Sequence, residues 1–408
     1  MPVKSPAHTP RPIPRYALNK GKGGHLTPIL SPEESKEFLK RGFSRRNFGR
    51  IATMLTAGAT LPFYNEPALA QLSMVKGPMP PDAVIINANE NPMGPCAEAA
   101  EAIHNIVQKG GRYMYPLTND LQGTLAAVEG VKPDYVRAFA GSSAPLHQAV
   151  LAFCSPQRSY VVADPGYEAG SKAAKFIGAK AINVPLTKDY AHDVKAMAKA
   201  DSNAGLIYLC NPNNPTGSLT SREDMEWLLA NKPAGSILMV DEAYIHLAGG
   251  ASTMVDMAGK DKEIIVLRTF SKLYGMAGLR AGAAIGRPDL LEKIMPYSAG
   301  ALPVTAMVGA NASLKVKNLV PERRKIIQDV REDVLSFLDK NNFHYVPSVS
   351  NKFMVDVKRP GREVIDAMAK EKVYIGRVWP SWPTYVRVSI GTRDDMAKFK
   401  TAFLKVMA

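Results

Sequence analysis

Cysteine is scarce in this sequence, with three among 408 residues, at positions 96, 154 and 210. So few and such widely spaced cysteines exclude a disulfide scaffold and a zinc cluster, and their apolar neighbours predict small core residues. Long apolar runs are missing too. Residues 51–64 carry no charge, but this stretch contains Thr and Gly and is shorter than the ~20 residues that span a bilayer. A stable membrane helix is therefore not expected.

Acidic residues are in the minority: 37 Asp and Glu face 51 Lys and Arg, a formal net charge of +14. Such an excess is typical of proteins that bind nucleic acid or membrane surfaces. Half of it lies in residues 1–70, which hold 11 basic and 4 acidic residues, a net charge of +7. The other +7 is spread over 338 residues without a basic block, so no nucleic-acid partner is expected.

The first 70 residues have the parts of an export leader. Residues 1–30 lack apolar periodicity and are predicted to be disordered. Arg45 and Arg46 precede the uncharged residues 51–64, and an Ala-x-Ala cleavage pattern ends at Ala70. This arrangement resembles a twin-arginine signal, which implies the twin-arginine translocation machinery as a partner and a periplasmic location after cleavage behind Ala70. The alternative is an exposed basic turn before an ordinary helix.

Beyond the leader, short apolar runs alternate with segments of helical period. We expect strands at residues 84–86, 136–140, 160–163, 206–210, 237–240, 264–268 and 281–285, with helices such as 146–153 and 222–229 between them. Near-continuous apolar strands alternating with helices predict an α/β fold with a mainly parallel, seven-stranded sheet covered on both faces. Ligands of such sheets bind beyond the carboxyl ends of the strands.

The last part of the chain predicts a smaller α+β domain. A long charged amphipathic helix at 321–339 is followed by a strand at 352–357, a helix at 363–371 and a strand at 384–390. We therefore divide the chain into a leader (1–70), a segment joining the small domain (71–114), a large domain (115–300) and a small C-terminal domain (301–408).

Several short polar motifs follow the predicted strands of the large domain. They are Gly141-Ser142-Ser143-Ala144, the Asn-Pro-Asn-Asn-Pro-Thr-Gly run at 211–217, Asp241-Glu242-Ala243-Tyr244, Thr269-Phe270-Ser271-Lys272, and Arg280. Each alone is ordinary turn or surface chemistry. Their order after consecutive strands makes chance a poor explanation.

Pyridoxal phosphate chemistry requires this set of groups. A lysine amine forms a Schiff base with the cofactor aldehyde, and a carboxylate keeps the pyridine nitrogen protonated. Asn and Tyr donate to the ring hydroxyl, while hydroxyls, an arginine and a helix N-terminus hold the phosphate. No metal is expected.

Residues 87–392 resemble a fold-type I aminotransferase and, most closely, histidinol-phosphate aminotransferase. Further matching segments lie at 87–92, 113–116, 164–167, 278–280 and 386–392. The resemblance implies pyridoxal 5'-phosphate as cofactor, and an amino acid and a 2-oxo acid as substrates.

The resemblance also implies residue roles. Lys272, Asp241 and Tyr244 are the catalytic candidates. The cofactor-binding candidates are Ser142, Ser143, Tyr167, Asn214, Asp241, Tyr244, Thr269, Ser271, Lys272, Arg280 and Tyr115. The resemblance implies that Tyr115 reaches the partner subunit's cofactor, so that a homodimer shares its sites.

The substrate-binding candidates are Arg387, which clamps the α-carboxylate, Asn89, which touches the substrate, and Arg377, which would meet a substrate phosphate. We expect an amino acid substrate, because export would separate the enzyme from the cytosolic supply of histidinol phosphate. Histidinol phosphate stays one candidate. A decarboxylase or lyase on the same fold, and a non-catalytic binding protein, stay open as alternatives.

Overall fold

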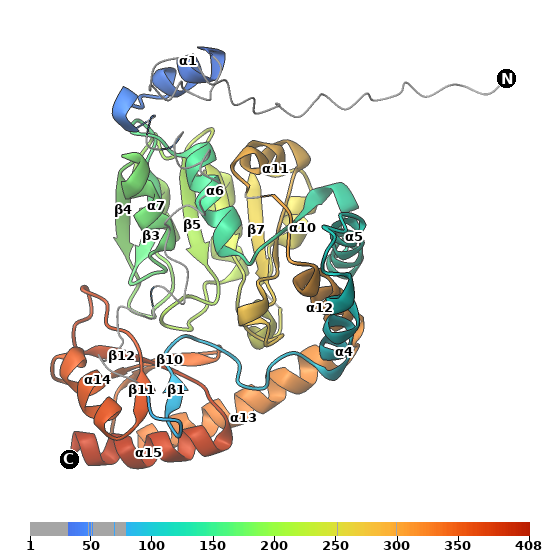
Figure 1. Cartoon of the computed structure of the whole chain (residues 1–408). Helices are drawn as coiled ribbons and strands as arrows, with labels where there is room; N and C mark the ends of the chain where they lie inside the picture. The colour runs from blue at the N-terminus through green and yellow to red at the C-terminus, as the bar shows by residue number, and fades with distance from the viewer. Residues whose placement is uncertain are drawn as a thin grey trace, which may run out of the picture.

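The computed structural model describes residues 32–47, 49, 51, 69, 79–250, 252–298 and 300–408. Its strands form three separate sheets (Figure 1). The strands are β1 (Val84–Ile86), β2 (Val136–Phe139), β3 (Tyr160–Asp164), β4 (Ala181–Pro185), β5 (Leu206–Cys210), β6 (Ile237–Asp241), β7 (Ile264–Thr269), β8 (Gly282–Gly286), β9 (Tyr345–Val346), β10 (Lys352–Asp356), β11 (Val373–Ile375) and β12 (Tyr385–Ser389).

The largest sheet has seven strands in the order β2-β8-β7-β6-β5-β3-β4. All neighbouring pairs are parallel except those of β8, which is antiparallel to both β7 and β2. The predicted α/β class and mainly parallel seven-stranded sheet are thus confirmed. One member differs: β1 pairs with β11 in a two-stranded sheet, and β4, which we did not predict, takes the seventh place.

Helices cover both faces of this sheet because successive strand residues point to opposite sides. In β5, Leu206, Tyr208 and Cys210 pack into one apolar core, and Ile207 and Leu209 into another. The first core includes side chains of α6 (Ser143–Phe153), α7 (Ala169–Ile177) and α11 (Pro288–Ile294). The second includes side chains of α5 (Pro116–Glu129), α8 (Val194–Lys199), α9 (Arg222–Asn231) and α10 (Val255–Gly259).

The three-stranded sheet belongs to the C-terminal part of the chain, where β10 pairs with β12 and β9, and the two-stranded sheet joins β1 to β11 of the same part. The remaining helices here and beside the large sheet are α4 (Ala97–Ile106), α12 (Val304–Lys315), α13 (Leu319–Lys340), α14 (Gly361–Lys370) and α15 (Arg393–Met407). Helix α13 runs along the lower edge of the molecule toward α15 (Figure 1). The predicted domain boundaries at residues 70, 114 and 300 stay predictions.

Part of the leader contacts the folded chain. Helix α1 (Pro32–Lys40) leads to Arg41, whose Nη2 donates to the carbonyls of Leu151, Ala152 and Cys154 at 2.7–3.0 Å. These carbonyls lie at the end of α6, where helix carbonyls lack intrahelical partners and favour a cation.

The predicted disorder of residues 1–30 and the cleavage pattern at Ala68 and Ala70 lie outside the described residues. None of the helices in the described part of the chain has the length and apolar character needed to cross a membrane.

Candidate active site

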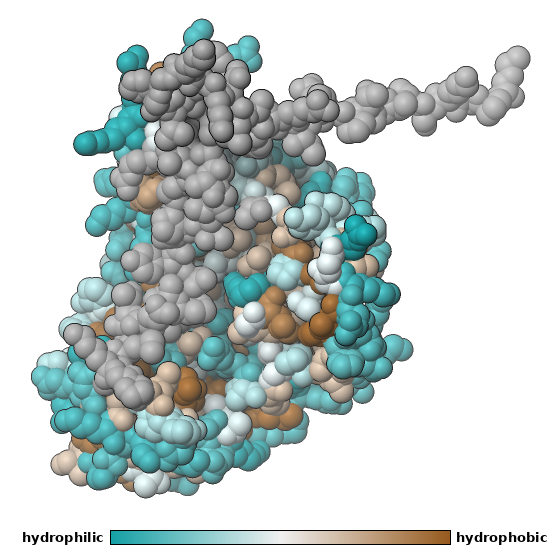
Figure 2. Space-filling view, in the orientation of Figure 1, coloured by the Kyte–Doolittle hydropathy of each residue, from teal (hydrophilic) through white to brown (hydrophobic). Residues whose placement is uncertain are grey.

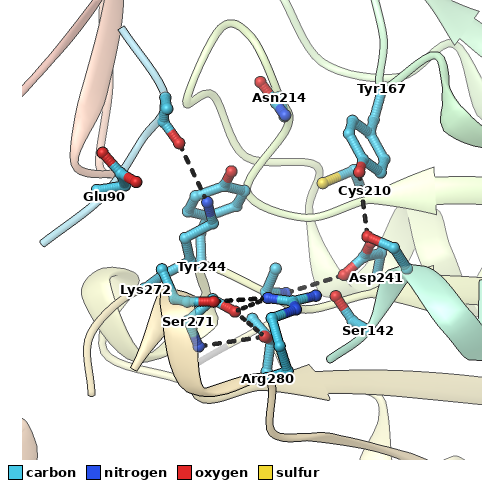
Figure 3. Close-up of a pocket in the computed structure, with 15 residues that line it drawn as sticks. Glu90, Ser142, Tyr167, Cys210, Asn214, Asp241, Tyr244, Ser271, Lys272 and Arg280 are labelled. Carbon is cyan, nitrogen blue, oxygen red and sulfur yellow. Dashed lines mark hydrogen bonds between the residues drawn. The ribbon is translucent and has the colours of Figure 1, made fainter. Parts of the chain in front are cut away.

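A pocket opens at the carboxyl ends of β5, β6 and β7, where the fold predicts a ligand site. Its volume, including the open mouth, is about 590 Å³. Figure 3 shows side chains from separate elements facing this space. The lining residues are Ala88, Glu90, Ser142, Ser143, Tyr167, Cys210, Asn214, Asp241, Ala243, Tyr244, Thr269, Ser271, Lys272, Ala277 and Arg280.

Asp241 is the buried carboxylate of the pocket and ends β6, next to Cys210 of β5. Its Oδ2 accepts from the Tyr208 hydroxyl at 2.8 Å, and its Oδ1 accepts from the Ala243 amide at 3.1 Å. Burial raises the pKa of Asp241 to about 6, although these hydrogen bonds and Lys272 oppose the shift. A cationic ring nitrogen would favour the charged form of this carboxylate.

Lys272 follows β7, and its side chain is buried in the same pocket. Its Nζ donates to the Ala88 carbonyl at 3.4 Å and lies 5.7 Å from the centroid of the Tyr244 ring. The amine therefore faces the pocket from one side, and Asp241 contributes to its lining from β6 (Figure 3).

Hydroxyl groups and a guanidinium gather at one end of the pocket. The Arg280 Nη1 donates to Ser271 Oγ at 3.2 Å, and Thr269 Oγ1 donates to the same oxygen at 3.0 Å. Ser142 and Ser143 line this end from the start of α6, whose N-terminal amides favour an anion. Burial lowers the pKa of Arg280, and Tyr167 opposes that shift.

Gly141 makes this arrangement sterically possible. Its φ is +84°, and a Cβ here would lie 2.3 Å from the Arg280 Nη2. The conformation and the contact both favour glycine.

Polar side chains also form a connected network beside Tyr244. Asn89 Nδ2 donates to the Tyr244 hydroxyl at 3.0 Å and to Asn214 Oδ1 at 3.4 Å. The same Asn214 oxygen accepts from Arg387 Nη1 at 2.9 Å, while Arg387 Nη2 donates to the Asn87 carbonyl at 2.7 Å. Two substrate-binding candidates, Asn89 and Arg387, are thus linked to the pocket-lining Asn214.

The third substrate-binding candidate, Arg377, accepts from the Arg387 amide through its carbonyl at 3.2 Å but has other side-chain partners, and the cofactor-binding candidate Tyr115 lies on the surface. Arg377 Nη1 forms an ion pair with Glu168 at 2.7 Å, and the guanidinium stacks on the Trp379 ring at 4.5 Å. Tyr115 precedes α5, is 64% exposed, and stacks on Tyr113 at 5.9 Å. Neither Arg377 nor Tyr115 lines the pocket in this chain.

Sequence reasoning missed several residues around the site. Tyr208, which holds Asp241, is one of five apolar residues of a buried strand and has no motif to mark it. Arg268 on β7 pairs with Glu242 next to Asp241, and with Glu129 at 2.6 Å, so it fixes the two strand ends against each other. Within the described ranges, no group of three or more His, Cys, Asp and Glu side chains is placed to hold a metal ion.

The groups in the pocket fit pyridoxal phosphate. A buried carboxylate suits a protonated ring nitrogen, a buried amine suits an aldehyde, and the hydroxyl and guanidinium donors suit a phosphate dianion. Fold and site together define a pyridoxal-phosphate enzyme of fold type I.

Comparison with known proteins identifies the family. The aminotransferase class I and II family matches residues 81–403. The chain is 31% identical over 339 residues to the histidinol-phosphate aminotransferase of Moorella thermoacetica, covering 80% of this chain and 86% of that protein. It is 32% identical over 329 residues to the aromatic amino acid aminotransferase of Nocardia farcinica, covering 78% and 90%.

A solved structure agrees with these relatives. Histidinol-phosphate aminotransferase from Sinorhizobium meliloti in complex with pyridoxal-5'-phosphate superimposes with a TM-score of 0.76 and 25% identity, covering 85% of this chain and 95% of that one. The chain therefore belongs to the class I and II aminotransferases. It is a pyridoxal-phosphate-dependent transaminase similar to histidinol-phosphate aminotransferase.

Proposed function

We propose that Lys272, Asp241 and Tyr244 carry the amino-transfer chemistry. The observation that supports this most directly is the meeting of a buried amine, a buried carboxylate and a phenol at the ends of neighbouring strands. When bound, pyridoxal phosphate supplies an electron-accepting ring. Lys272 holds the cofactor and moves a proton at its Nζ, Asp241 keeps the ring nitrogen charged, and Tyr244 donates to the ring oxygen.

The remaining pocket residues orient the cofactor in this proposal. Arg280 and the neighbouring hydroxyls bind the phosphate, Asn214 donates to the ring oxygen, and Tyr167 covers the ring face. Tyr167 supports this role because it is buried in the pocket lining and its hydroxyl lies 3.2 Å from Ser143 Oγ. The phosphate-binding hydroxyls are Ser142, Ser143, Thr269 and Ser271.

Arg387 binds the α-carboxylate of the substrate in this proposal. It is fully buried on β12 and held by Asn214 and the Asn87 carbonyl, so its guanidinium is pre-oriented for a bidentate contact. Asn89 lies beside it and contacts the substrate. A lysine at position 387 lacks the planar fork, so Arg387→Lys is expected to raise KM for the amino donor at least tenfold.

The substrates are an amino donor and a 2-oxo acid, and the two candidate donors are an amino acid, such as an aromatic one, and histidinol phosphate, which has a phosphate ester and no α-carboxylate. Arg377 is the candidate for a substrate phosphate, and its ion pair with Glu168 partly neutralises it. A panel of amino donors and 2-oxo acids, with histidinol phosphate included, tests the assignment on the holoenzyme. Release of CO2 without 2-oxo acid would instead identify a decarboxylase.

The enzyme is also proposed to be exported by the twin-arginine route and to act in the periplasm after cleavage behind Ala70. Arg45 and Arg46 support this because both are exposed. Replacing both with lysine keeps the charge and is expected to retain the precursor in the cytosol. Unchanged export of that variant, measured by fractionation, would contradict the proposal.

A homodimer with shared sites is proposed as the working assembly. Tyr113 and Tyr115 are 70% and 64% exposed, which is unusual for a stacked aromatic pair. Figure 2 shows apolar residues on the face beside α5 and α12, and α5 begins directly after Tyr115. Light scattering on the purified holoenzyme tests the assembly, and a monomer at working concentration would contradict it.

A further inference from the structure

One charged residue beside the pocket has no part in the functions described above. Lys352 begins β10 and is fully buried, which is rare for lysine because its charge loses water. Its Nζ lies 3.2 Å from the centroid of the Tyr244 ring and donates to Ser350 Oγ at 2.9 Å. The ammonium therefore rests on the face of a proposed catalytic phenol.

The position of Lys352 is fixed by contacts on both sides. Its strand pairs with β12, where Lys352 lies opposite Ser389, and the Ser389 hydroxyl donates to Asn89 Oδ1 at 3.2 Å. Its carbonyl accepts from Ser348 and lies near Gly217, where a Cβ would come within 3.0 Å of it. The segment that carries Lys352 is thus packed against the loop of Asn214, and the lysine reaches from the C-terminal sheet to Tyr244, which follows β6 of the large sheet.

The charge on the ring face has a direct consequence for the phenol. The Tyr244 oxygen accepts a hydrogen bond from Asn89 Nδ2 at 3.0 Å, and a phenol hydroxyl can donate as well as accept. A cation over an aromatic ring is attracted to the ring electrons and stabilises negative charge on the phenol oxygen. Both contacts make the Tyr244 hydroxyl a stronger hydrogen-bond donor.

We propose that Lys352 is a positioning residue that acts through Tyr244, strengthening the hydrogen bond from Tyr244 to the ring oxygen of bound pyridoxal phosphate and so stabilising negative charge on that oxygen. The proposal rests on the assigned role of Tyr244. Its consequence is that the bound cofactor releases its proton at a lower pH than it would without Lys352.

Other charged groups near Tyr244 also influence the pH at which the bound cofactor loses its proton. None of them is changed in the variants described below. The Lys272 Nζ lies 5.7 Å from the ring centroid, Asp241 ends β6 just before Tyr244, and Arg387 is connected through Asn214. Burial raises the pKa of the nearby Cys210 thiol, and the positive charge of Lys352 acts against that shift. Lys352 therefore also interacts electrostatically with a second residue that lines the pocket.

Lys352→Met tests the proposal because methionine keeps the length and removes the charge. The measurement is the midpoint of the pH titration of the bound cofactor's visible absorbance. The midpoint is expected to rise by at least half a pH unit, about a threefold tighter hold on the proton. Lys352→Arg, which retains the charge, should stay close to the parent enzyme.

Lys358→Met is the matched control, since Lys358 follows the same strand but its side chain is 74% exposed. It removes the same charge and should leave the midpoint unchanged. If Lys352→Met fails to fold, as judged by circular dichroism, Lys352→Gln gives the same comparison while keeping a donor for Ser350. An unshifted midpoint in a folded, cofactor-loaded variant would overturn the proposal.

The route through Tyr244 is tested separately. In a Tyr244→Phe background the shift caused by Lys352→Met should fall by more than half, and an equal shift in both backgrounds would overturn the route. The apoenzyme gives a second readout: the phenol titration assigned to Tyr244, from the ultraviolet difference between parent and Tyr244→Phe, should move to higher pH in Lys352→Met. A different result would contradict the proposed role of Tyr244 itself: the single variant Tyr244→Phe would then titrate its bound cofactor at the same pH as the parent enzyme.

Discussion

At the scale of single residues, the site is built from ionisable side chains that have lost most of their water. Asp241, Lys272, Lys352 and Arg387 are each exposed by 7% or less. Burying such groups costs free energy unless hydrogen bonds or opposite charges replace the water. The contacts of Asp241 with Tyr208 and Ala243 replace only part of it, because the pKa of Asp241 still rises to about 6.

This cost predicts a pH-dependent stability of the apoenzyme. Between an ordinary value of 3.8 and a folded pKa of about 6, Asp241 keeps a proton in the folded chain that it has lost in the unfolded chain. Stability should therefore fall as the pH rises through this window, by about 3 kcal/mol in total. Asp241→Asn should lack this part of the fall when urea unfolding is compared at pH 4 and pH 7. Parallel pH profiles for the two proteins would contradict the assignment.

At the scale of elements, the turn between β2 and α6 sets the position of Arg280. A Cβ on Gly141 would displace the Arg280 Nη2, which donates to the Ala140 carbonyl at 3.3 Å. Gly141→Ala is expected to weaken pyridoxal phosphate binding at least tenfold and to lower stability by about 1 kcal/mol. Cofactor titration followed by absorbance measures the first effect, and urea unfolding the second.

Gly130 provides the matched control for this change. It ends α5 with a φ of +69°, and a Cβ there meets nothing within 4 Å. Gly130→Ala should lower the free energy of unfolding by a similar amount, because alanine also replaces glycine at a positive φ there, without weakening cofactor binding. Equal losses of cofactor affinity in the two variants would show that the contact with Arg280 has no role.

These strands show which parts of the fold and the site can be predicted from the sequence. β5, β6 and β7 are predicted because each is a continuous apolar run with both faces buried, and the motifs at their ends predict the pocket. β4 has one buried residue among five and no such apolar run, so its pattern does not predict a strand. Tyr208 and Lys352 were missed for another reason: each acts on a residue far away in sequence, and only the packing of strands brings the pairs together.

At the scale of the whole molecule, the leader is separable from the site. Every residue that lines the pocket lies between Ala88 and Arg280, while the leader contacts the end of α6 through Arg41. Removing residues 1–70 should leave kcat/KM within about twofold and lower the free energy of unfolding by more than about 3 kcal/mol, because the hydrogen bonds of Arg41 and the buried side chains of Phe38 and Phe43 are lost. Arg41→Ala in the full chain should show part of the same loss. A deletion variant without transaminase activity would contradict this separation.

The exposed Tyr115 allows a stricter test of shared sites than a measured mass. If Tyr115 serves the partner's cofactor, a mixed dimer of Lys272→Ala and Tyr115→Ala subunits places both defects in one site and leaves the other intact. Random mixing should then restore about a quarter of the parent activity from two impaired proteins, since half the dimers are mixed and each has one intact site. Mixing Lys272→Ala with Arg280→Ala is the control, because both residues line the same pocket of one chain and no site becomes whole. Mixed dimers that are isolated by two affinity tags and show no recovered activity would place Tyr115 outside the partner's site.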